Sequence, residues 1–513
     1  MTAPTSLRAK AGIVLFLAAL LAFLFASAMA RNLNHDEHQF IAPAVLLAQD
    51  GLQPYRDFPL FHLPNLVFLY AALFRVFDHP FLTARCFSVL CAFATAALIF
   101  RECWHRPPFG LTRWRFAAAA ATALFLVLDP LFFYTTGLTW NHDSTALFIV
   151  LAVLLQVKAA RENSIPHALA SAVCASLAAG IRLTVTPILI PLWLSIWFFP
   201  APIRRRALIA AIYVVTATAA LGPSLYYLAV HTDAFLFGNF EFPRLRLLDP
   251  ENERIRKTMH PLRKLRFFFK EVALPSLPLF LAFLAFAVAP AWKFFRTRAN
   301  ELFAPALVLA ILPFALIACF TPSRYHYQHC FIIIPLLILG VVFGIRTLSS
   351  PPKWALISAL ALVVLSFLRF TYKSHDDILP GPVRDWFPNR IATIGTAIAA
   401  QSPRGPILTL APIYPMAAGL KTYPEFSTGL FGWKSARFVA NERREALHLL
   451  APEDLIDLLS SRPPGGILTG VEAANFEKPL LEYSRAHHFT PVKLGKERTL
   501  WLPPSPQDPE NGN

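Results

Sequence analysis

The chain has 513 residues, of which 56% are hydrophobic and only 15% are charged. Soluble chains carry about 25% charged residues, so this composition excludes a purely cytosolic enzyme. Long apolar runs in place of polar tracts also exclude an intrinsically disordered chain. The composition therefore predicts an integral membrane protein.

Basic residues outnumber acidic ones, 47 against 31. The excess lies before residue 373, with 32 basic and 16 acidic residues there and 15 of each from Lys373 onward. The cations stand between apolar runs, which is typical of topology signals rather than of a nucleic-acid surface, so we expect no nucleic-acid partner. Six cysteines without a zinc-like spacing and the lack of a glycine-rich phosphate loop lead us to expect no metal and no cofactor.

The first apolar run, residues 11–30, follows Arg8 and Lys10. We interpret it as an uncleaved span with a cytoplasmic N-terminus, because its apolar core is longer than that of a secretory signal. A cleaved signal peptide is the alternative, since Ala26 and Ala28 are small residues near a possible cleavage position.

Ten further apolar runs approach the roughly 20 residues that a bilayer core requires, which gives about eleven transmembrane helices. These runs are 81–100, 116–134, 144–157, 167–182, 184–199, 207–230, 273–292, 302–320, 328–345 and 354–371. Cytoplasmic loops are rich in Lys and Arg. The basic clusters at 101–115, 158–161 and 204–206 all lie on the cytoplasmic side only if residues 167–199 cross the membrane twice. Gly180 and Pro187 offer the break between those two crossings.

Counting the predicted crossings from a cytoplasmic N-terminus places five segments outside the cytoplasm: residues 31–80, 135–143, 231–272, 321–327 and everything after 372. The first of these loops is apolar enough to hold amphipathic helices lying along the membrane. The stretch 254–270 carries seven cations and no acid, which opposes the positive-inside tendency. Attraction to lipid phosphates and a different topology are both open explanations.

The composition turns polar after residue 372, and strand-like runs occur at 406–410 and 466–469. A helix is expected from Ala451, with Pro452 near its start and acids at its positive end. We therefore predict a transmembrane catalytic domain over residues 1–372, an extracytoplasmic α/β domain over 373–502, and a disordered tail over 503–513.

Asn34-His35-Asp36-Glu37-His38 directly follows the first span. A carboxylate beside hydrocarbon is costly unless it is solvated or paired, so two adjacent acids indicate either a general base or a solvated helix cap. Nearby histidines at positions 35, 38, 62 and 142 could hold a divalent cation with Asp36, although their spacing matches no metal motif.

This first loop resembles that of the GT-C glycosyltransferases, in particular the protein O-mannosyltransferase and aminoarabinose-transferase branch. The resemblance rests on the acidic motif at 35–38, Ala42, Ala44, Gly51, Pro54-Tyr55-Arg56-Asp57-Phe58, Pro64 and Thr83-Ala84-Arg85, together with the order of spans and a C-terminal external domain. It implies a multispanning enzyme that takes a sugar from a polyprenyl-phosphate carrier and inverts the anomeric centre.

The resemblance also implies roles for individual residues. Asp36 matches the family's acid after the first span and Glu37 its frequent neighbour, while Asp143 in Trp140-Asn141-His142-Asp143 matches a second external acid. Many relatives carry an acid and a basic residue before the proline matched by Pro64, where this chain has Phe61-His62-Leu63. That departure puts phosphate binding at this point in doubt.

Arg182 and Arg324 lie where relatives carry basic residues, and a guanidinium within an apolar run must face a polar cavity or pair with an acid. Binding of the donor phosphate and structural pairing are both open for Arg182. The expected partners are a polyprenyl-phosphate-sugar donor, a lipid, glycan or protein acceptor, and membrane lipids. The expected location is the plasma (inner) membrane.

Two other function classes compete with the glycosyltransferase. A transporter or flippase of polyprenyl-linked glycans would use buried charges as a relay, although the chain lacks the matching repeats that many transporters show. A membrane-anchored sensor or carbohydrate-binding protein could stack sugars on the aromatic residues of segment 419–429 and on Trp433, although aromatic residues in a small domain more often form its core. Eleven spans are far more than such an anchor needs.

Overall fold

The computed structural model describes residues 7–105, 115–248, 259–322, 325–347 and 381–504, and a few positions between 361 and 371. The chain divides into two compact units. The first comprises Met1–Ala28, Cys86–Ser224 and Glu251–Pro380, and the second comprises Met29–Arg85, Leu225–Pro250 and Gly381–Asn513. The expected functional division at residue 372 stays a prediction.

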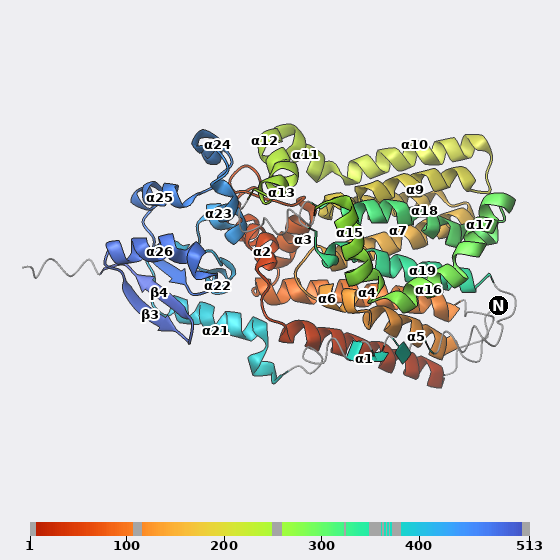
Figure 1. Cartoon of the computed structure of the whole chain (residues 1–513), viewed down its shortest axis with the longest axis horizontal. Coiled ribbons are helices and arrows are strands. Elements are labelled where there is room, and N and C mark those ends of the chain that lie inside the picture. The colour runs from red at the N-terminus through yellow and green to blue at the C-terminus, as the bar shows by residue number, and fades with distance from the viewer. Residues whose placement is uncertain are drawn as a thin grey trace, which may run out of the picture. The chain divides into compact units, whose positions relative to one another are not determined.

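The first unit is built from helices, several of which run in one general direction in Figure 1. Its helical segments, including two that extend across the division, are α1 (Leu7–Ala30), α4 (Pro80–His105), α5 (Arg115–Val127), α6 (Pro130–Thr135), α7 (His142–Glu162), α8 (Ile165–Ile181), η5 (Leu183–Ile188), α9 (Leu189–Ser195), η6 (Ile196–Phe198), α10 (Ile203–Ala220), α15 (Pro261–Phe268), η9 (Phe269–Ala273), α16 (Leu277–Phe286), α17 (Val288–Thr297), η10 (Asn300–Leu302), α18 (Phe303–Phe320), η11 (Tyr327–Cys330) and α19 (Ile333–Ile345).

Six helical stretches among the described residues are long and apolar enough to cross a membrane, and a seventh qualifies when α10 is taken together with α11 (Gly222–Val230). The six are Ala9–Ala30, Pro80–His105, His142–Glu162, Leu277–Thr297, Asn300–Phe320 and Tyr327–Ile345. The runs 116–134, 167–182 and 184–199 form shorter apolar helices. A multispanning helical fold is thereby supported, whereas the count of eleven spans stays a prediction, and most of run 354–371 lies outside the described residues.

The break that Gly180 and Pro187 predict is present. Helix α8 ends at Ile181, Arg182 takes an extended conformation with φ of −140°, and the 3₁₀ segment η5 follows with Pro187 inside it. Because Pro187 cannot donate a backbone hydrogen bond, it disfavours a continuous helix here. Whether the two halves cross the membrane separately stays a prediction.

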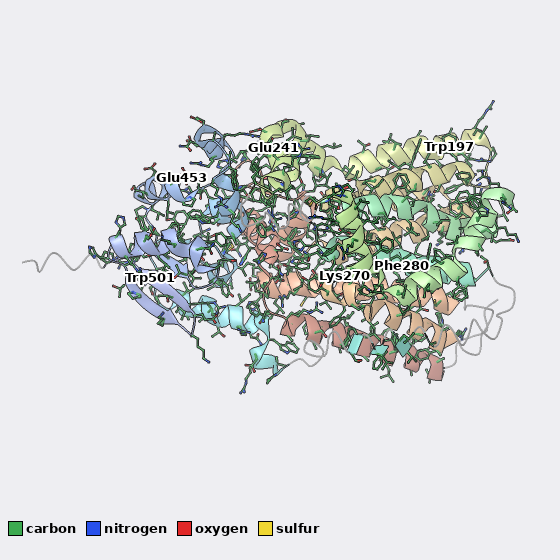
Figure 2. All side chains as sticks on the ribbon, in the orientation of Figure 1. Trp197, Glu241, Lys270, Phe280, Glu453 and Trp501 are labelled. Atoms are coloured by element: carbon green, nitrogen blue, oxygen red, sulfur yellow. The ribbon has the colours of Figure 1, made fainter. Side chains whose placement is uncertain are left out.

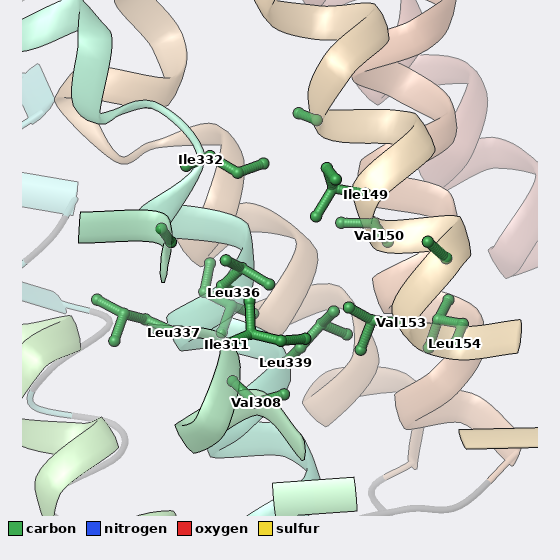
Figure 3. Close-up of a cluster of buried hydrophobic side chains, with 14 of the residues drawn as sticks. Ile149, Val150, Val153, Leu154, Val308, Ile311, Ile332, Leu336, Leu337 and Leu339 are labelled. Atoms are coloured by element: carbon green, nitrogen blue, oxygen red, sulfur yellow. The ribbon is translucent and has the colours of Figure 1, made fainter. Parts of the chain in front are cut away.

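The core of the first unit lies where α7, α18 and α19 meet. Val150 and Val153 of α7 are buried with Ile311 of α18 and Leu336 and Leu339 of α19, as Figure 3 shows. Helix α19 also approaches α16 closely, since a Cβ added at Gly344 would lie 2.1 Å from the carbonyl oxygen of Phe286. Only glycine fits at that position.

The second unit joins three separate stretches of the chain. Its helical segments are η1 (His35–Glu37), α2 (His38–Val45), η2 (Leu46–Asp50), α3 (Asn65–Phe74), α11, α12 (Thr232–Leu236), η7 (Phe237–Glu241), α13 (Phe242–Leu245), η12 (Val383–Asp385), α21 (Phe387–Ala399), α22 (Ile413–Met416), η13 (Pro424–Phe426), α23 (Leu430–Ala436), α24 (Asn441–Ala446), η14 (Pro452–Asp454), α25 (Leu455–Ser461) and α26 (Ala474–Ala486).

An aromatic cluster holds these stretches together. Phe61 stacks on Phe242 with ring centroids 3.8 Å apart, and Phe237 and Phe431 pack in the same cluster. Arg443 adds ion pairs at 2.8 Å to Asp233 and Glu241 (Glu241 is labelled in Figure 2). All eight residues of α2 are buried, so this helix does not present the amphipathic, membrane-lying face expected for the first loop.

The second unit also contains a four-stranded sheet, whose strands lie in the order β1-β2-β4-β3. The strands are β1 (Ile407–Leu408), β2 (Gly466–Thr469), β3 (Thr490–Leu494) and β4 (Arg498–Leu502). Strands β1 and β2 are parallel, whereas β4 pairs antiparallel with β2 and β3. The strand-like runs and the helix after Ala451 are confirmed, while tail residues 505–513 lie outside the described residues.

Candidate functional site

The acidic motif after α1 folds into one short 3₁₀ turn, η1. The Asn34 side chain accepts a hydrogen bond from the backbone N–H of Asp36 at 3.0 Å. The Glu37 carboxylate accepts one from the backbone N–H of Asn34 at 2.9 Å. These reciprocal bonds form a capping box. The side chains of Asp36 and Glu37 lie in different environments.

Glu37 is committed to an ion pair. Both its side chain and that of Arg85 are 0% exposed. Arg85 donates from Nε to Oε1 at 3.1 Å and from Nη2 to Oε2 at 2.9 Å, and it also donates to the backbone carbonyls of Arg31 and Asn32. The guanidinium lies 4.5 Å from the centroid of the Phe81 ring. A buried carboxylate with this fork-like partner is poorly placed to accept a substrate proton, and these contacts favour a structural role for Glu37.

Asp36 is the accessible member of the pair. Its side chain is 28% exposed, and within the part of the chain that the structure describes its carboxylate has one ionic neighbour, Nε2 of His35 at 3.8 Å. The capping hydrogen bond uses the backbone of Asp36 and leaves both carboxylate oxygens available. Of the two acids, Asp36 is therefore the one whose carboxylate is partly exposed.

The histidines of this loop do not gather into a ligand set. His38 is buried without a hydrogen-bond partner among the described residues, and burial, reinforced by His35, lowers the pKa of its imidazole to about 3. His62 stacks on Phe40 at 4.6 Å. Among the described residues, no group of three or more His, Cys, Asp or Glu side chains could hold a metal ion.

Arg182 lies in the break between α8 and η5, where its side chain is buried. One guanidinium nitrogen, Nη1, donates to Asn141 Oδ1 at 2.7 Å and lies 3.1 Å from Nε2 of His142. Nη2 lies 2.7 Å from Nδ1 of His329, and Nε donates to Thr184 at 3.2 Å. The broken helix thus places a permanent cation within a buried polar cluster of the first unit.

Asp143 adjoins this cluster at the start of α7. Its Oδ2 accepts a hydrogen bond from the backbone N–H of Gly137 at 2.7 Å and thereby closes the turn between α6 and α7. Gly137 has φ of +77°, and an added Cβ would lie 2.3 Å from the Cβ of Ala28. Asp143 therefore shapes the turn that carries Asn141 and His142.

Arg324 lies outside the described residues, as do Arg254, Arg256 and Lys257 of the basic stretch. The turn before Arg324 is held by Lys264, whose Nζ donates to the carbonyl oxygens of Phe320 at 2.6 Å and Pro322 at 3.0 Å. One cation of the basic stretch thus caps the C-terminus of α18.

The structure brings together residues that the sequence left apart. In the first unit Arg182 meets Asn141 and His142, and Asp143 braces the same turn. In the second unit Glu37 forms an ion pair with Arg85. Arg85 belongs to the Thr83-Ala84-Arg85 motif of the family resemblance, which implies no role for it. The signal for Arg85 was available, because a lone arginine in an apolar run requires a partner. No comparable feature of the sequence indicated that His329 would contact Arg182. Trp433 and Phe426 lie in the hydrophobic core, which agrees with a core role for these aromatic residues and leaves them unsuited to stacking on a sugar.

Comparison with solved structures finds the same fold. ArnT from Cupriavidus metallidurans bound to undecaprenyl phosphate matches over 96% of this chain and 98% of that chain, with a TM-score of 0.57 at 14% identity. Its apo state matches over the same shares with a TM-score of 0.55. The chain therefore has the fold of ArnT, a GT-C glycosyltransferase, and the expected resemblance is confirmed for the fold.

A weaker likeness is found to an oligosaccharyltransferase from Archaeoglobus fulgidus, over 76% of this chain and 56% of that chain, with 14% identity and a TM-score of 0.46. No protein-family model matches the chain, and no curated protein matches its sequence.

Proposed function

We propose that the protein is a membrane glycosyltransferase that transfers a sugar from a polyprenyl-phosphate-linked donor to an acceptor hydroxyl. The observation that carries this proposal is the fold likeness to ArnT, because it extends over almost the whole of both chains and ArnT was solved with undecaprenyl phosphate. A shared fold can host unrelated functions, so the residues must supply the rest of the argument.

Asp36 is proposed as the general base. It removes the proton of the acceptor hydroxyl while the hydroxyl oxygen attacks the anomeric carbon of the sugar. The bond between that carbon and the phosphate oxygen breaks, and the electron pair leaves with the polyprenyl phosphate. Attack opposite to the leaving group inverts the anomeric centre. The partial exposure of the Asp36 carboxylate supports this assignment over Glu37, which is buried and held by Arg85.

Arg182 is proposed to bind the donor phosphate. A guanidinium presents two parallel N–H groups to phosphate oxygens, and charge developing on a leaving phosphate is stabilised by a fixed cation. The neighbouring Asn141, His142 and His329 hold the guanidinium in place. Asp143 is proposed as a supporting acid that shapes this turn, and Arg324 as a second phosphate ligand.

The proposed setting is the plasma (inner) membrane, with the N-terminus in the cytoplasm and residues after 372 outside. The acceptor class is a lipid, a glycan or a protein. No cofactor or metal is required by this chemistry, since the carboxylate supplies the base and arginine the positive charge.

The test uses the full-length protein in liposomes with undecaprenyl-phosphate-linked glucose, mannose and arabinose, each ¹⁴C-labelled in the sugar, and membranes of the source organism as acceptor. We expect label to move from the carrier to the lipid, glycan or protein fraction. Asp36→Asn should lower this rate by about 10² to 10⁴-fold while leaving binding of undecaprenyl phosphate unchanged. Near-normal transfer by Asp36→Asn would reject the base. Movement of the intact carrier-linked sugar across the bilayer without cleavage would favour the transporter instead.

A further inference from the structure

The continuous helical segment α15 and η9, residues 261–273, carries two parallel stripes on its exposed side. Leu262, Leu265 and Phe269 follow one another at helical spacing and are 69%, 43% and 58% exposed. Arg263, Arg266 and Lys270 have the same spacing, one residue further along, and are also exposed. Because the residues of each triplet stand three and four positions apart, each triplet lines one side of the helix.

The opposite side of this segment is fixed to the first unit. Lys264, Phe268 and Val272 stand at successive positions four apart and are buried. Lys264 holds the backbone carbonyls of Phe320 and Pro322 at the end of α18, and Phe268 packs edge to face on Phe280 at 6.1 Å. In Figure 1, α15 lies across the direction followed by α18 and α10. The two exposed stripes are therefore displayed by an anchored helix.

We propose that this segment is a docking surface for the anionic phospholipids of the membrane leaflet that it meets. An apolar stripe beside a basic stripe is the arrangement of helices that lie in a membrane interface, with leucine and phenylalanine among the acyl chains and arginine and lysine at the headgroups. Residues 261–273 carry four cations and one acid, which gives a net charge of +3. The acid, Glu271, pairs with Lys270 at 3.2 Å.

Charge complementarity indicates which molecule covers these two stripes. A protein segment covering the apolar stripe would have to be acidic as well, whereas an anionic bilayer surface offers hydrocarbon and phosphate side by side. The same surface would explain why basic residues occur at 263–270 in a segment expected outside the cytoplasm, because these cations would bind lipid phosphates. The inference does not depend on the proposed enzymatic activity.

The first test identifies what covers the apolar stripe. A benzophenone amino acid is placed at Leu265 of the full-length protein in nanodiscs of phosphatidylcholine and phosphatidylglycerol in a 7:3 ratio. The matched control is Ile456, an exposed residue of α25. After illumination we expect phospholipid adducts at position 265 and none at 456. Crosslinks from 265 to protein, or the absence of any adduct, would overturn the proposal. A second benzophenone site at Leu262 repeats the measurement if the first variant folds poorly.

The second test concerns the basic stripe. We expect phosphatidylglycerol to be enriched severalfold over its bulk ratio among the adducts at position 265. Each basic residue near an anionic surface contributes roughly a fivefold preference, so Arg263→Gln/Arg266→Gln/Lys270→Gln should return the adducts to the bulk ratio. The control Lys478→Gln/Arg485→Gln/Lys496→Gln removes three exposed cations of the second unit and should change nothing. A bulk ratio in the unmodified protein, or an enrichment that survives the first triple change, would contradict an anionic partner.

Discussion

Glu37 and Arg85 form a two-pronged ion pair in which neither side chain is exposed to solvent. The pair joins the turn after α1 to a residue of α4 that lies 48 positions further along the chain. Because Arg85 also donates to the carbonyls of Arg31 and Asn32, it fixes the backbone on which Asp36 is carried. The two neighbouring acids thus have separate tasks: one holds the turn and the other remains available.

The ion pair predicts that Glu37→Gln destabilises the protein. Removing one partner of a buried pair leaves the other charge uncompensated and typically costs about 3–5 kcal/mol. We expect a clearly lowered midpoint of thermal unfolding in detergent, followed by tryptophan fluorescence. Asp36→Asn is the matched control, since it makes the same chemical change one residue away on a partly exposed side chain, and it should unfold near the wild-type temperature. Equal midpoints for the two variants would refute the structural assignment of Glu37.

The Arg182 cluster predicts weaker binding of undecaprenyl phosphate by Arg182→Lys. Lysine keeps the charge but loses the two-pronged donor geometry, and charge-assisted hydrogen bonds contribute about 1.5–3 kcal/mol. The dissociation constant should therefore rise by about 10- to 100-fold in a direct binding assay in detergent.

The control for Arg182 is Arg346→Lys, because Arg346 is also largely buried and pairs with Glu102 at 3.2 Å. That variant should bind undecaprenyl phosphate normally. Thermal unfolding of both variants without ligand separates a loss of fold from a loss of binding. If the two variants bind equally well, Arg182 is a structural residue.

The turn between α6 and α7 predicts that Gly137→Ala is destabilising. The added Cβ would lie 2.3 Å from that of Ala28, and the backbone has a positive φ that alanine disfavours. Overpacking of this kind costs about 1–3 kcal/mol. Gly12→Ala is the control, because nothing lies within 4 Å of the added Cβ there. The double change Ala28→Gly/Gly137→Ala should recover part of the lost stability, and no recovery would show that the contact is not limiting.

Much of the helical fold could be predicted from the sequence, because apolar runs of span length leave few alternatives in a membrane. The run 116–134 is an exception, since it divides into α5 and α6. Asp129 accepts hydrogen bonds from the backbone N–H groups of Leu131 and Phe132, and Pro130 begins the new helix. An acid followed by proline is a helix-start signal, but hydropathy alone hides it. The hairpin of β3 and β4 escaped prediction because its strands alternate only weakly between buried and exposed residues.

The chemistry of the site was less predictable. Asp36 and Glu37 are adjacent and chemically alike. Their difference, one partly exposed and the other buried in an ion pair, depends on Arg85, which the tertiary structure brings to Glu37. The position of Arg182 at a helix break followed from Gly180 and Pro187. Its hydrogen bonds to Asn141, His142 and His329 did not, because they join residues up to 147 positions apart.

The buried His38 predicts a specific dependence of stability on pH. Burial, with a smaller contribution from His35, lowers the pKa of His38 from 6.5 to about 3 in the folded state. The unfolded chain therefore binds a proton between pH 6.5 and 3 that the folded chain does not, and protonation favours unfolding. The contribution of His38 is complete above pH 6.5 and is lost progressively as the pH falls toward 3.

His38→Leu removes this titration and leaves the side chain apolar. Unfolding midpoints measured from pH 7.5 to 4 should fall less steeply for His38→Leu than for the wild type, so that the variant gains relative stability as the solution becomes more acidic. His79→Gln is the control, because His79 is exposed and should leave the slope unchanged. Carboxylates contribute to the pH dependence of every variant alike. The effect of His38 is therefore the difference between the midpoint-against-pH curves of the wild type and His38→Leu. Parallel curves for His38→Leu and the wild type would mean that His38 is protonated equally in the folded and unfolded chains.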